Sequence, residues 1–273
     1  MSFDAASIRG LAPAGLFSLE GQVAVVTGAG GGIGRWLAAG LGAAGARVLL
    51  TDIEADAIEA VCGTLEEAGI ECAGLALDLR DADAPERIVA GATDRLGGLN
   101  VLVNNAVTNR RMPILEMDRE TFDLIMELDL RLPYFLSQAA ARTMKESGGG
   151  AIVNISSINF SYGLEQISVY GPAKAGLSQL TRVMALEWAQ HGIRANAIAP
   201  GYMDTPLAAP IWADPDMSRW IMNRVPAERP GQPAELVGAC QLLASDAGSF
   251  ITGQTFVVDG GFMAGGRWFT PDK

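Results

Sequence analysis

The sequence predicts an α/β fold: a single doubly wound domain of about seven parallel strands with helices on both faces. Three observations predict it. Short apolar runs alternate with longer helical stretches along most of the 273 residues. The runs lack the strict alternation of a half-exposed strand, which is typical of parallel strands buried on both faces. No linker, repeat or low-complexity tract interrupts them, so we expect one domain over residues 20–273, preceded by an arm over residues 1–19.

The elements follow in order along the chain. Strands are expected at 23–26, 48–50, 75–77, 99–103, 151–155, 193–198 and 255–258, and helices at 35–46, 56–68, 84–96 and 116–146, with another from Tyr170 onward. The fourth of these helices is unusually long and contains Pro133. Residues 202–230 are rich in proline, methionine and tryptophan and fit no regular pattern. A segment this long in a compact domain is usually functional, so we expect a substrate loop there.

Composition and charge exclude several classes of protein. Hydrophobic residues make up 49% of the chain and charged residues 19%, which excludes a disordered chain. The net charge of −11 disfavours nucleic-acid binding. No apolar run is long enough for a membrane span, and the N-terminus lacks the basic and apolar regions of a signal peptide. We therefore expect a cytoplasmic protein that binds neither membranes nor nucleic acid.

Cysteine and histidine usage argues against metal and hydrolase chemistry. Cys62, Cys72 and Cys240 do not have the spacing of a zinc site, so we expect ordinary thiols. The single histidine, His191, precedes Gly192, where a helix is expected to end. A cation is favourable at that end, so we interpret His191 as a capping residue. The alternative is a catalytic base, which any Ser-His-Asp or Cys-His hydrolase would need. We expect no metal.

A glycine-rich turn follows the first strand. Residues 27–34 read Thr-Gly-Ala-Gly-Gly-Gly-Ile-Gly and open the first helix. Free backbone N–H groups at a helix N-terminus attract a pyrophosphate, and glycines let it come close. The strict G-x-G-x-x-G form fails because isoleucine occupies its last position, and a plain tight turn is the alternative. The cofactor contacts expected here are Gly28, Gly30, Gly31, Gly32, Ile33 and Gly34.

Asp52 ends the second apolar run, 24 residues after Gly28. A carboxylate at about this spacing accepts hydrogen bonds from the adenosine ribose and repels a 2′-phosphate. We therefore expect NAD as cofactor, with NADP less favoured. The alternative is that Asp52 caps the next helix. If NADP is the cofactor, Arg35 is the nearest candidate for its phosphate.

Three residues in the second half predict proton transfer. Ser157 closely follows the strand at 151–155, and Tyr170 precedes Lys174 by four residues, about one helical turn. A tyrosine hydroxyl, with a pKa near ~10, is a weak base at neutral pH, but a neighbouring ammonium lowers that pKa. Ser157 is placed to hydrogen-bond the substrate oxygen. Together these residues predict a proton-transfer site for an alcohol or a carbonyl.

The chain resembles the short-chain dehydrogenase/reductase family over about residues 17–262. Residues 27–34 match its T-G-x-x-x-G-x-G turn, and residues 170–174 match its Y-x-x-x-K motif. Asn104-Asn105-Ala106, Asp78-Leu79, Pro200-Gly201 with Thr205, and Val258-Asp259-Gly260-Gly261 resemble further family segments. The resemblance implies additional cofactor contacts at Ile53, Asp78, Leu79, Asn105, Ala106, Tyr170, Lys174, Pro200, Gly201 and Thr205.

The same resemblance implies a reaction. A hydride passes between a nicotinamide cofactor and the secondary alcohol or ketone of a small molecule: a sugar or polyol, a hydroxy or oxo acid, or a 3-oxoacyl compound. Tyr170 is the implied proton donor or acceptor, Ser157 steadies the reacting oxygen, and Lys174 holds the ribose and tunes Tyr170. The family usually forms homotetramers. We expect a homotetramer or homodimer, with the tail from Gly265 to Lys273 (which includes Trp268 and Phe269) at an interface.

Two positions depart from the family pattern. Val107 stands where a glycine is usual, and Asp129 stands where the family carries its catalytic asparagine. That asparagine helps to hold a water through its backbone carbonyl, which Asp129 keeps, so we expect activity. We also expect the carboxylate to raise the pKa of Lys174 if the two are close. The alternatives are a catalytically impaired NAD-binding or interaction protein, and a dehydratase or epimerase on the same fold.

The substrate is expected beside the cofactor strands. Candidate contacts are Arg110, Asn159, Tyr202 and Trp212. Arg110 or its neighbour Arg111 pairs with a substrate carboxylate, or both form a solvated face. The apolar side chains of residues 202–230 form a lid over the substrate, or they pack between subunits.

Overall fold

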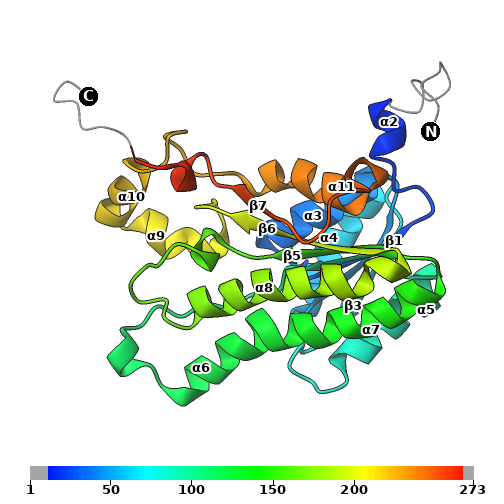
Figure 1. Cartoon of the computed structure of the whole chain (residues 1–273), viewed down its shortest axis with the longest axis horizontal. Helices are drawn as coiled ribbons and strands as arrows, with labels where there is room; N and C mark the ends of the chain where they lie inside the picture. Colours follow the sequence, from blue (N-terminus) through cyan, green and yellow to red (C-terminus); the bar gives the residue numbers. More distant parts are fainter. Residues whose placement is uncertain (1–11, 267–273) are drawn as a thin grey trace.

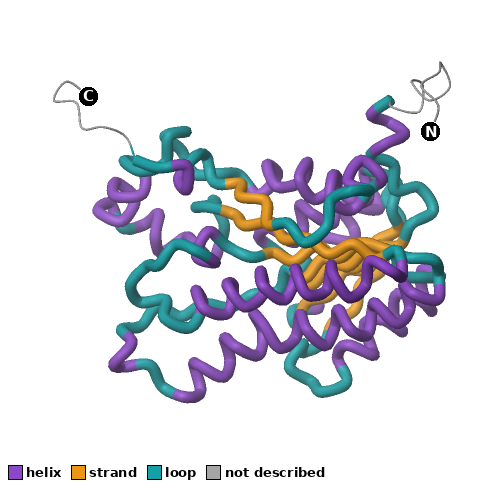
Figure 2. The backbone as a smooth tube through the Cα atoms, viewed as in Figure 1, coloured by secondary structure: helices purple, strands orange, loops and turns teal. Residues whose placement is uncertain are grey.

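The computed structural model describes residues 12–266, which form one parallel sheet between two layers of helices (Figures 1 and 2). Within that range the strands number seven, in the order β3-β2-β1-β4-β5-β6-β7. They are β1 (Val23–Thr27), β2 (Arg47–Asp52), β3 (Cys72–Ala76), β4 (Val101–Asn104), β5 (Gly150–Ile155), β6 (Ile193–Pro200) and β7 (Thr255–Val258). The predicted doubly wound fold is therefore confirmed.

Helices cover both faces of the sheet (Figure 1). One face carries α3 (Gly32–Ala43), α4 (Ala55–Glu67) and α11 (Val237–Ala244), and the other carries α5 (Ala84–Leu96), α7 (Leu132–Glu146) and α8 (Tyr170–Trp188). Shorter helices are α2 (Pro13–Leu16), α6 (Arg119–Met126), α9 (Ala209–Ala213) and α10 (Pro215–Met222). Every residue of β1 is buried because helices cover it on both sides.

Most predicted elements have the expected type, with shifted ends. The helix at Ala84–Leu96 has the predicted bounds. The first helix begins at Gly32 rather than Arg35, because the last glycines of the turn already belong to its first helical turn. The third strand begins at Cys72 rather than Leu75. It lies at the edge of the sheet and is only partly buried, so its apolar pattern is weak.

The prediction of one continuous helix over 116–146 is wrong. A π-helical turn, η2 (Glu127–Arg131), separates α6 from α7. Pro133 lies in the first turn of α7 and has no N–H for the carbonyl of Asp129, four residues earlier. Its ring also crowds that carbonyl, so the chain widens locally into a π turn. Such insertions are frequent at functional sites.

The segment at 202–230 is more regular than predicted. It contains α9, α10 and a 3₁₀ turn at Pro206–Ala208, and these enclose a small apolar cluster around Ile211, Ile221 and Phe262. At the other end of the chain, Leu19 is buried in the main core. The division at residue 20 stays a prediction, and Trp268 and Phe269 lie outside the described residues. Within residues 12–266, no helix has both the length and the apolarity needed to cross a membrane.

Candidate active site

A cavity of about 790 Å³ opens at the carboxyl ends of the parallel strands. Its lining includes residues that directly follow five strands: Gly28 after β1, Ile53 after β2, Asn105 after β4, Ser156 after β5, and Gly201 after β6. In open α/β sheets, ligands bind at this edge. The cavity is therefore the candidate active site.

Most of the predicted site residues line this cavity: Gly28, Gly31, Gly32, Ile33, Asp52, Ile53, Asp78, Leu79, Asn105, Ala106, Ser157, Asn159, Tyr170, Lys174, Pro200, Gly201, Tyr202 and Thr205. Five predicted residues do not line the cavity. Gly30 and Gly34 belong to the glycine turn, and Asp129 is fully buried. Arg110 is exposed outside the cavity, and Trp212 donates its indole N–H to the carbonyl of Met203. His191 precedes Gly192 at the end of α8, also outside the cavity.

The glycine turn fits an anionic dinucleotide. Helix α3 has no side-chain cap at its N-terminus, so its first N–H groups have no side-chain acceptor there. A Cβ on Gly31 or Gly32 would meet no atom within 4 Å, and both residues line the cavity. A Cβ on Gly34 would instead collide with the carbonyl oxygen of Gly28, which explains the glycine there. This open helix end would hold a pyrophosphate.

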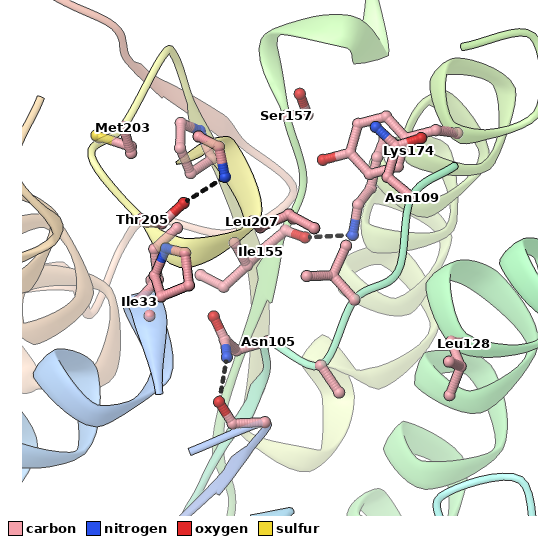
Figure 3. A pocket seen from close by; sticks show the side chains of 18 of the residues that line it. Ile33, Asn105, Asn109, Leu128, Ile155, Ser157, Lys174, Met203, Thr205 and Leu207 are labelled. Carbon is pink, nitrogen blue, oxygen red and sulfur yellow. Dashed lines mark hydrogen bonds between the residues drawn. The ribbon is translucent and has the colours of Figure 1, made fainter. Parts of the chain in front are cut away.

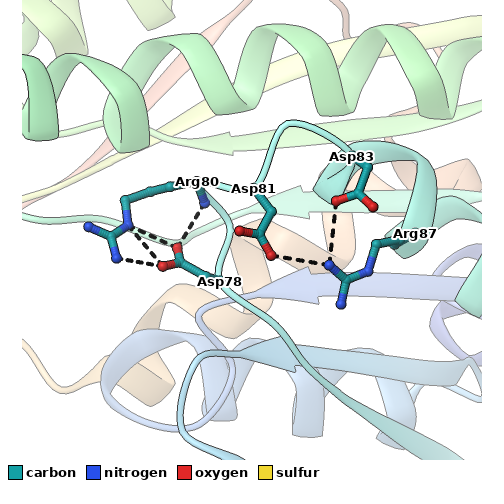
Figure 4. A network of polar contacts seen from close by, with 5 residues as sticks. All are labelled: Asp78, Arg80, Asp81, Asp83 and Arg87. Atoms are coloured by element: carbon teal, nitrogen blue, oxygen red, sulfur yellow. Dashed lines mark hydrogen bonds and ion pairs between the residues drawn. The ribbon is translucent and has the colours of Figure 1, made fainter.

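Two carboxylates line the same cavity beyond the turn. Asp52 ends β2 and accepts hydrogen bonds from the N–H groups of Gly30 (3.0 Å) and Ile53 (2.8 Å). The N-cap of α4 is Glu54, so the alternative role of Asp52 as that cap is not what the structure shows. Asp78 is paired with Arg80, whose hydrogen bonds hold the pKa of Asp78 below its usual value (Figure 4).

Asn105 ties the end of β4 to the glycine turn. Its side-chain amide donates to the carbonyl oxygens of Thr27 (2.8 Å) and Gly28 (3.1 Å), and its own N–H donates to the Thr27 hydroxyl (3.0 Å). The Thr27 hydroxyl also accepts from Ala106. These bonds fix the floor of the cavity. Val107, which departs from the family pattern, lines the cavity next to it.

Ser157, Tyr170 and Lys174 meet in this cavity. The Lys174 ammonium lies 5.6 Å from the centre of the Tyr170 ring and donates to the carbonyl oxygen of Ile155 at 3.0 Å (Figure 3). Ser157 is 7% exposed, and its hydroxyl exchanges 3.2 Å hydrogen bonds with Asn159. Burial raises the pKa of Tyr170, and the charge of Lys174 and a hydrogen bond with Ser157 oppose that rise.

Asp129 lies directly against Lys174. Its Oδ1 is 2.8 Å from the ammonium nitrogen, and the two side chains are 0% and 3% exposed. Its Oδ2 accepts the N–H of Thr108 at 3.2 Å. Burial raises the pKa of Asp129, and the ammonium opposes this. Burial alone would lower the pKa of Lys174, but the charges of Asp129 and Tyr170 raise it overall, as the sequence predicted.

The substrate side differs in detail from the prediction. Arg111, rather than Arg110, lines the cavity, and its guanidinium reaches to within 3.6 Å of the Met217 sulfur on α10. Asn109 lines it as well, and its buried Oδ1 has no hydrogen-bond partner among the described residues. Figure 3 shows Asn109 and Lys174 at the same end of the cavity.

Sequence reasoning did not single out several other lining residues: Arg80, Leu124, Leu128, Leu164, Ile167, Pro210 and Ile211. Leu124 and Leu128 are four residues apart on a helical stretch, so a shared face was a signal for both. Leu164 and Ile167 lie on an irregular segment, where no periodicity marks a face.

Known proteins resemble the chain closely. Residues 28–263 match the family model described as Enoyl-(Acyl carrier protein) reductase. Gluconate 5-dehydrogenase of Gluconobacter oxydans is 39% identical over 90% of this chain and 96% of its own. The 2-dehydro-3-deoxy-D-gluconate 5-dehydrogenase of Escherichia coli is 40% identical over 91% and 98%.

A solved structure shows the same arrangement. Gluconate 5-dehydrogenase from Burkholderia cenocepacia, in complex with NADP and tartrate, superposes with a TM-score of 0.88 at 34% identity over 91% of this chain and 98% of that one. The family match spans most of the sequence, and the two relatives align with 90% and 91% of it. The chain therefore belongs to the short-chain dehydrogenase/reductase family, as a nicotinamide-dependent oxidoreductase of secondary alcohols and ketones.

Proposed function

We propose that the protein interconverts a secondary hydroxyl and a ketone on a sugar acid, with NAD as cofactor. The observation that carries this proposal is one cavity lined both by Ser157, Tyr170 and Lys174 and by the cationic side chain of Arg111. The relatives named above act on gluconate or a dehydro-deoxy-gluconate, and these substrates combine secondary hydroxyls with a carboxylate.

Each residue of the site has its own role in the proposed reaction. In oxidation, the deprotonated oxygen of Tyr170 receives the proton of the substrate hydroxyl, and Ser157 donates a hydrogen bond to the reacting oxygen of the substrate. Lys174 orients the cofactor ribose and supplies positive charge beside Tyr170. The nicotinamide, when bound, accepts the hydride in oxidation or donates it in reduction. The open N-terminus of α3 would hold the pyrophosphate of the cofactor, and Asp52 would accept hydrogen bonds from the ribose hydroxyls.

The test is turnover on a panel of aldonic acids, keto-aldonic acids, polyols and 3-oxoacyl esters. We expect NAD-dependent oxidation of an aldonate and reduction of its keto form. Tyr170→Phe should lower kcat by about 100-fold or more while leaving cofactor affinity within a few-fold, because it removes only the proton-transferring oxygen. Calorimetry measures that affinity. If the panel gives no turnover but NAD binds, the protein is the impaired NAD-binding protein instead.

Arg111 is the proposed contact for the substrate carboxylate. It forms no ion pair with any residue in the described range, and Asn109 offers an unpartnered amide oxygen to a hydroxyl nearby. We expect Arg111→Met to raise KM for an aldonate about tenfold or more and to change KM for an uncharged polyol far less. Arg110→Met is the matched control, because Arg110 lies outside the cavity. Equal losses on both substrates would contradict the carboxylate contact.

The cofactor preference rests on Asp52. A carboxylate at the ribose end repels the 2′-phosphate of NADP. The nearby cation Arg80 is engaged by Asp78, and Arg35 does not line the cavity. The relative solved with NADP shows that the wider group includes NADP binders.

We also propose that the chain assembles as a homodimer or homotetramer. Helices α7 and α8 lie side by side on one face of the sheet (Figure 1). Both helices expose large apolar side chains. Leu186 on α8 is 82% exposed, and Tyr134 and Phe135 on α7 are more than 40% exposed. A second copy of the chain would bury these groups.

A further inference from the structure

The carboxylate of Asp129 occupies a position from which it acts on the lysine beside the proposed proton donor. The Lys174 ammonium has three protons. One is donated to the carbonyl oxygen of Ile155, and the ammonium nitrogen forms an ion pair with Asp129, 2.8 Å from its Oδ1. Lys174 also lines the cavity. Thr108 donates to the second carboxylate oxygen and holds the carboxylate in place.

Burial strengthens the electrostatic attraction between Asp129 and Lys174. Side chains that are 0% and 3% exposed are barely screened by water, so their mutual attraction is far stronger than at the surface. The positive charge of Lys174 is therefore balanced by a negative charge at contact distance. A neutral asparagine in place of Asp129 would leave the full ammonium charge to act on Tyr170. The proton affinity of Tyr170 depends on that balance.

We propose that Asp129 is a positioning residue that sets the pH range in which Tyr170 transfers its proton, by balancing the charge of the Lys174 ammonium. This inference rests on the proposed role of Tyr170. The Asp129 charge raises the pKa of Tyr170, whereas the Lys174 charge lowers it. Tyr170 consequently keeps its proton to higher pH than it would beside an asparagine. The protonated form is the one that donates to a ketone, so the reductive direction extends to higher pH.

Three other polar groups that line the cavity do not change charge over the pH range of this test. Arg111, from the loop after β4, carries a guanidinium, which is always positively charged in proteins. Burial raises the pKa of Tyr202, which follows β6, to about 12, so it stays neutral. Ser157, which follows β5, carries no charge. The effect of Asp129 on the titration of Tyr170 can therefore be measured without a change in the charge of these three groups.

The first test is the pH dependence of kcat/KM for alcohol oxidation at saturating cofactor. We expect Asp129→Asn to move the midpoint about one pH unit lower, which is about a fivefold gain in kcat/KM one unit below the wild-type midpoint and about a tenfold gain at pH values well below both midpoints. The plateau kcat should change only a few-fold, since Tyr170 and Lys174 remain. Glu127→Gln is the matched control: it removes a carboxylate from the same π turn, but that carboxylate pairs with the exposed Arg131. An unchanged or higher midpoint in Asp129→Asn overturns the proposal.

A second readout needs no turnover. The near-ultraviolet absorbance of tyrosinate is titrated in the free enzyme, and Tyr170→Phe identifies the Tyr170 contribution. We expect Tyr170 in the wild type to titrate above free tyrosine, because burial and the Asp129 charge raise its pKa, and to titrate lower in Asp129→Asn. A wild-type value well below that of free tyrosine overturns the proposal even if the variant does not fold. The expected titrations without turnover of any sugar acid would mean that only the proposed function fails.

Discussion

We expect one side chain, that of Asp52, to determine which nicotinamide cofactor the protein prefers. It sits at the end of β2 with one carboxylate oxygen held by the Gly30 N–H and the other by the Ile53 N–H, so it cannot readily turn away from the cavity. We expect wild-type protein to bind NAD at least tenfold more tightly than NADP, about 1.4 kcal/mol. Asp52→Asn should reduce that ratio mainly by improving NADP binding, because it removes the repulsion of the 2′-phosphate.

Calorimetry with both cofactors at one salt concentration measures the two affinities. Asp56→Asn is the control: it removes a negative charge from the first turn of α4, outside the cavity. A tighter binding of NADP by the wild type would refute the role of Asp52. Arg80, which lines the cavity beside Asp78, would then become the candidate phosphate ligand.

At the scale of elements, a buried polar network connects the sheet to the helices that carry the site. Asn104 on β4 donates to Asn154 on β5 (2.7 Å) and to Ser137 on α7 (2.9 Å), and Asn154 donates to Thr181 on α8 (2.8 Å). All four side chains are at most 3% exposed. The network therefore fixes α8, and with it Tyr170, against the strand that leads to Ser157.

We expect Asn154→Ala to lower the free energy of unfolding by about 3 kcal/mol, because it removes one buried hydrogen bond from each of Asn104 and Thr181. Chemical denaturation measures the loss. Gln138→Ala, on α7 next to Ser137, breaks only an exposed hydrogen bond with Arg142 and should cost less than about 0.5 kcal/mol. Similar losses in the two variants would argue against the network.

Most strands and helices and the polar residues of the site could be predicted from the sequence, because apolar patterns and fixed motif spacings mark them. Features that no such pattern marks were missed. Buried parallel strands are continuously apolar, so β1, β2 and β5 were visible, and the motifs around Gly28 and Tyr170 have fixed spacings. The π turn at Glu127–Arg131 was missed because Pro133 was noticed but its effect on the preceding carbonyl was not used. Whether Arg110 or Arg111 enters the cavity depends on a loop path, and no periodicity encodes that path.

At the scale of the whole molecule, the exposed apolar side chains on α7 and α8 bear on assembly. An acidic monomer would gain little by keeping Leu186 82% exposed, whereas burying it against a second copy stabilises the assembly.

We expect sedimentation to show a homodimer or homotetramer. Leu186→Glu should shift the protein to smaller species, because it places a charge in an apolar contact. Gln179→Glu adds the same charge on the same helix at an exposed polar position and should leave sedimentation unchanged. A wild-type monomer, or an assembly unaffected by Leu186→Glu, would place the contact between copies on another face.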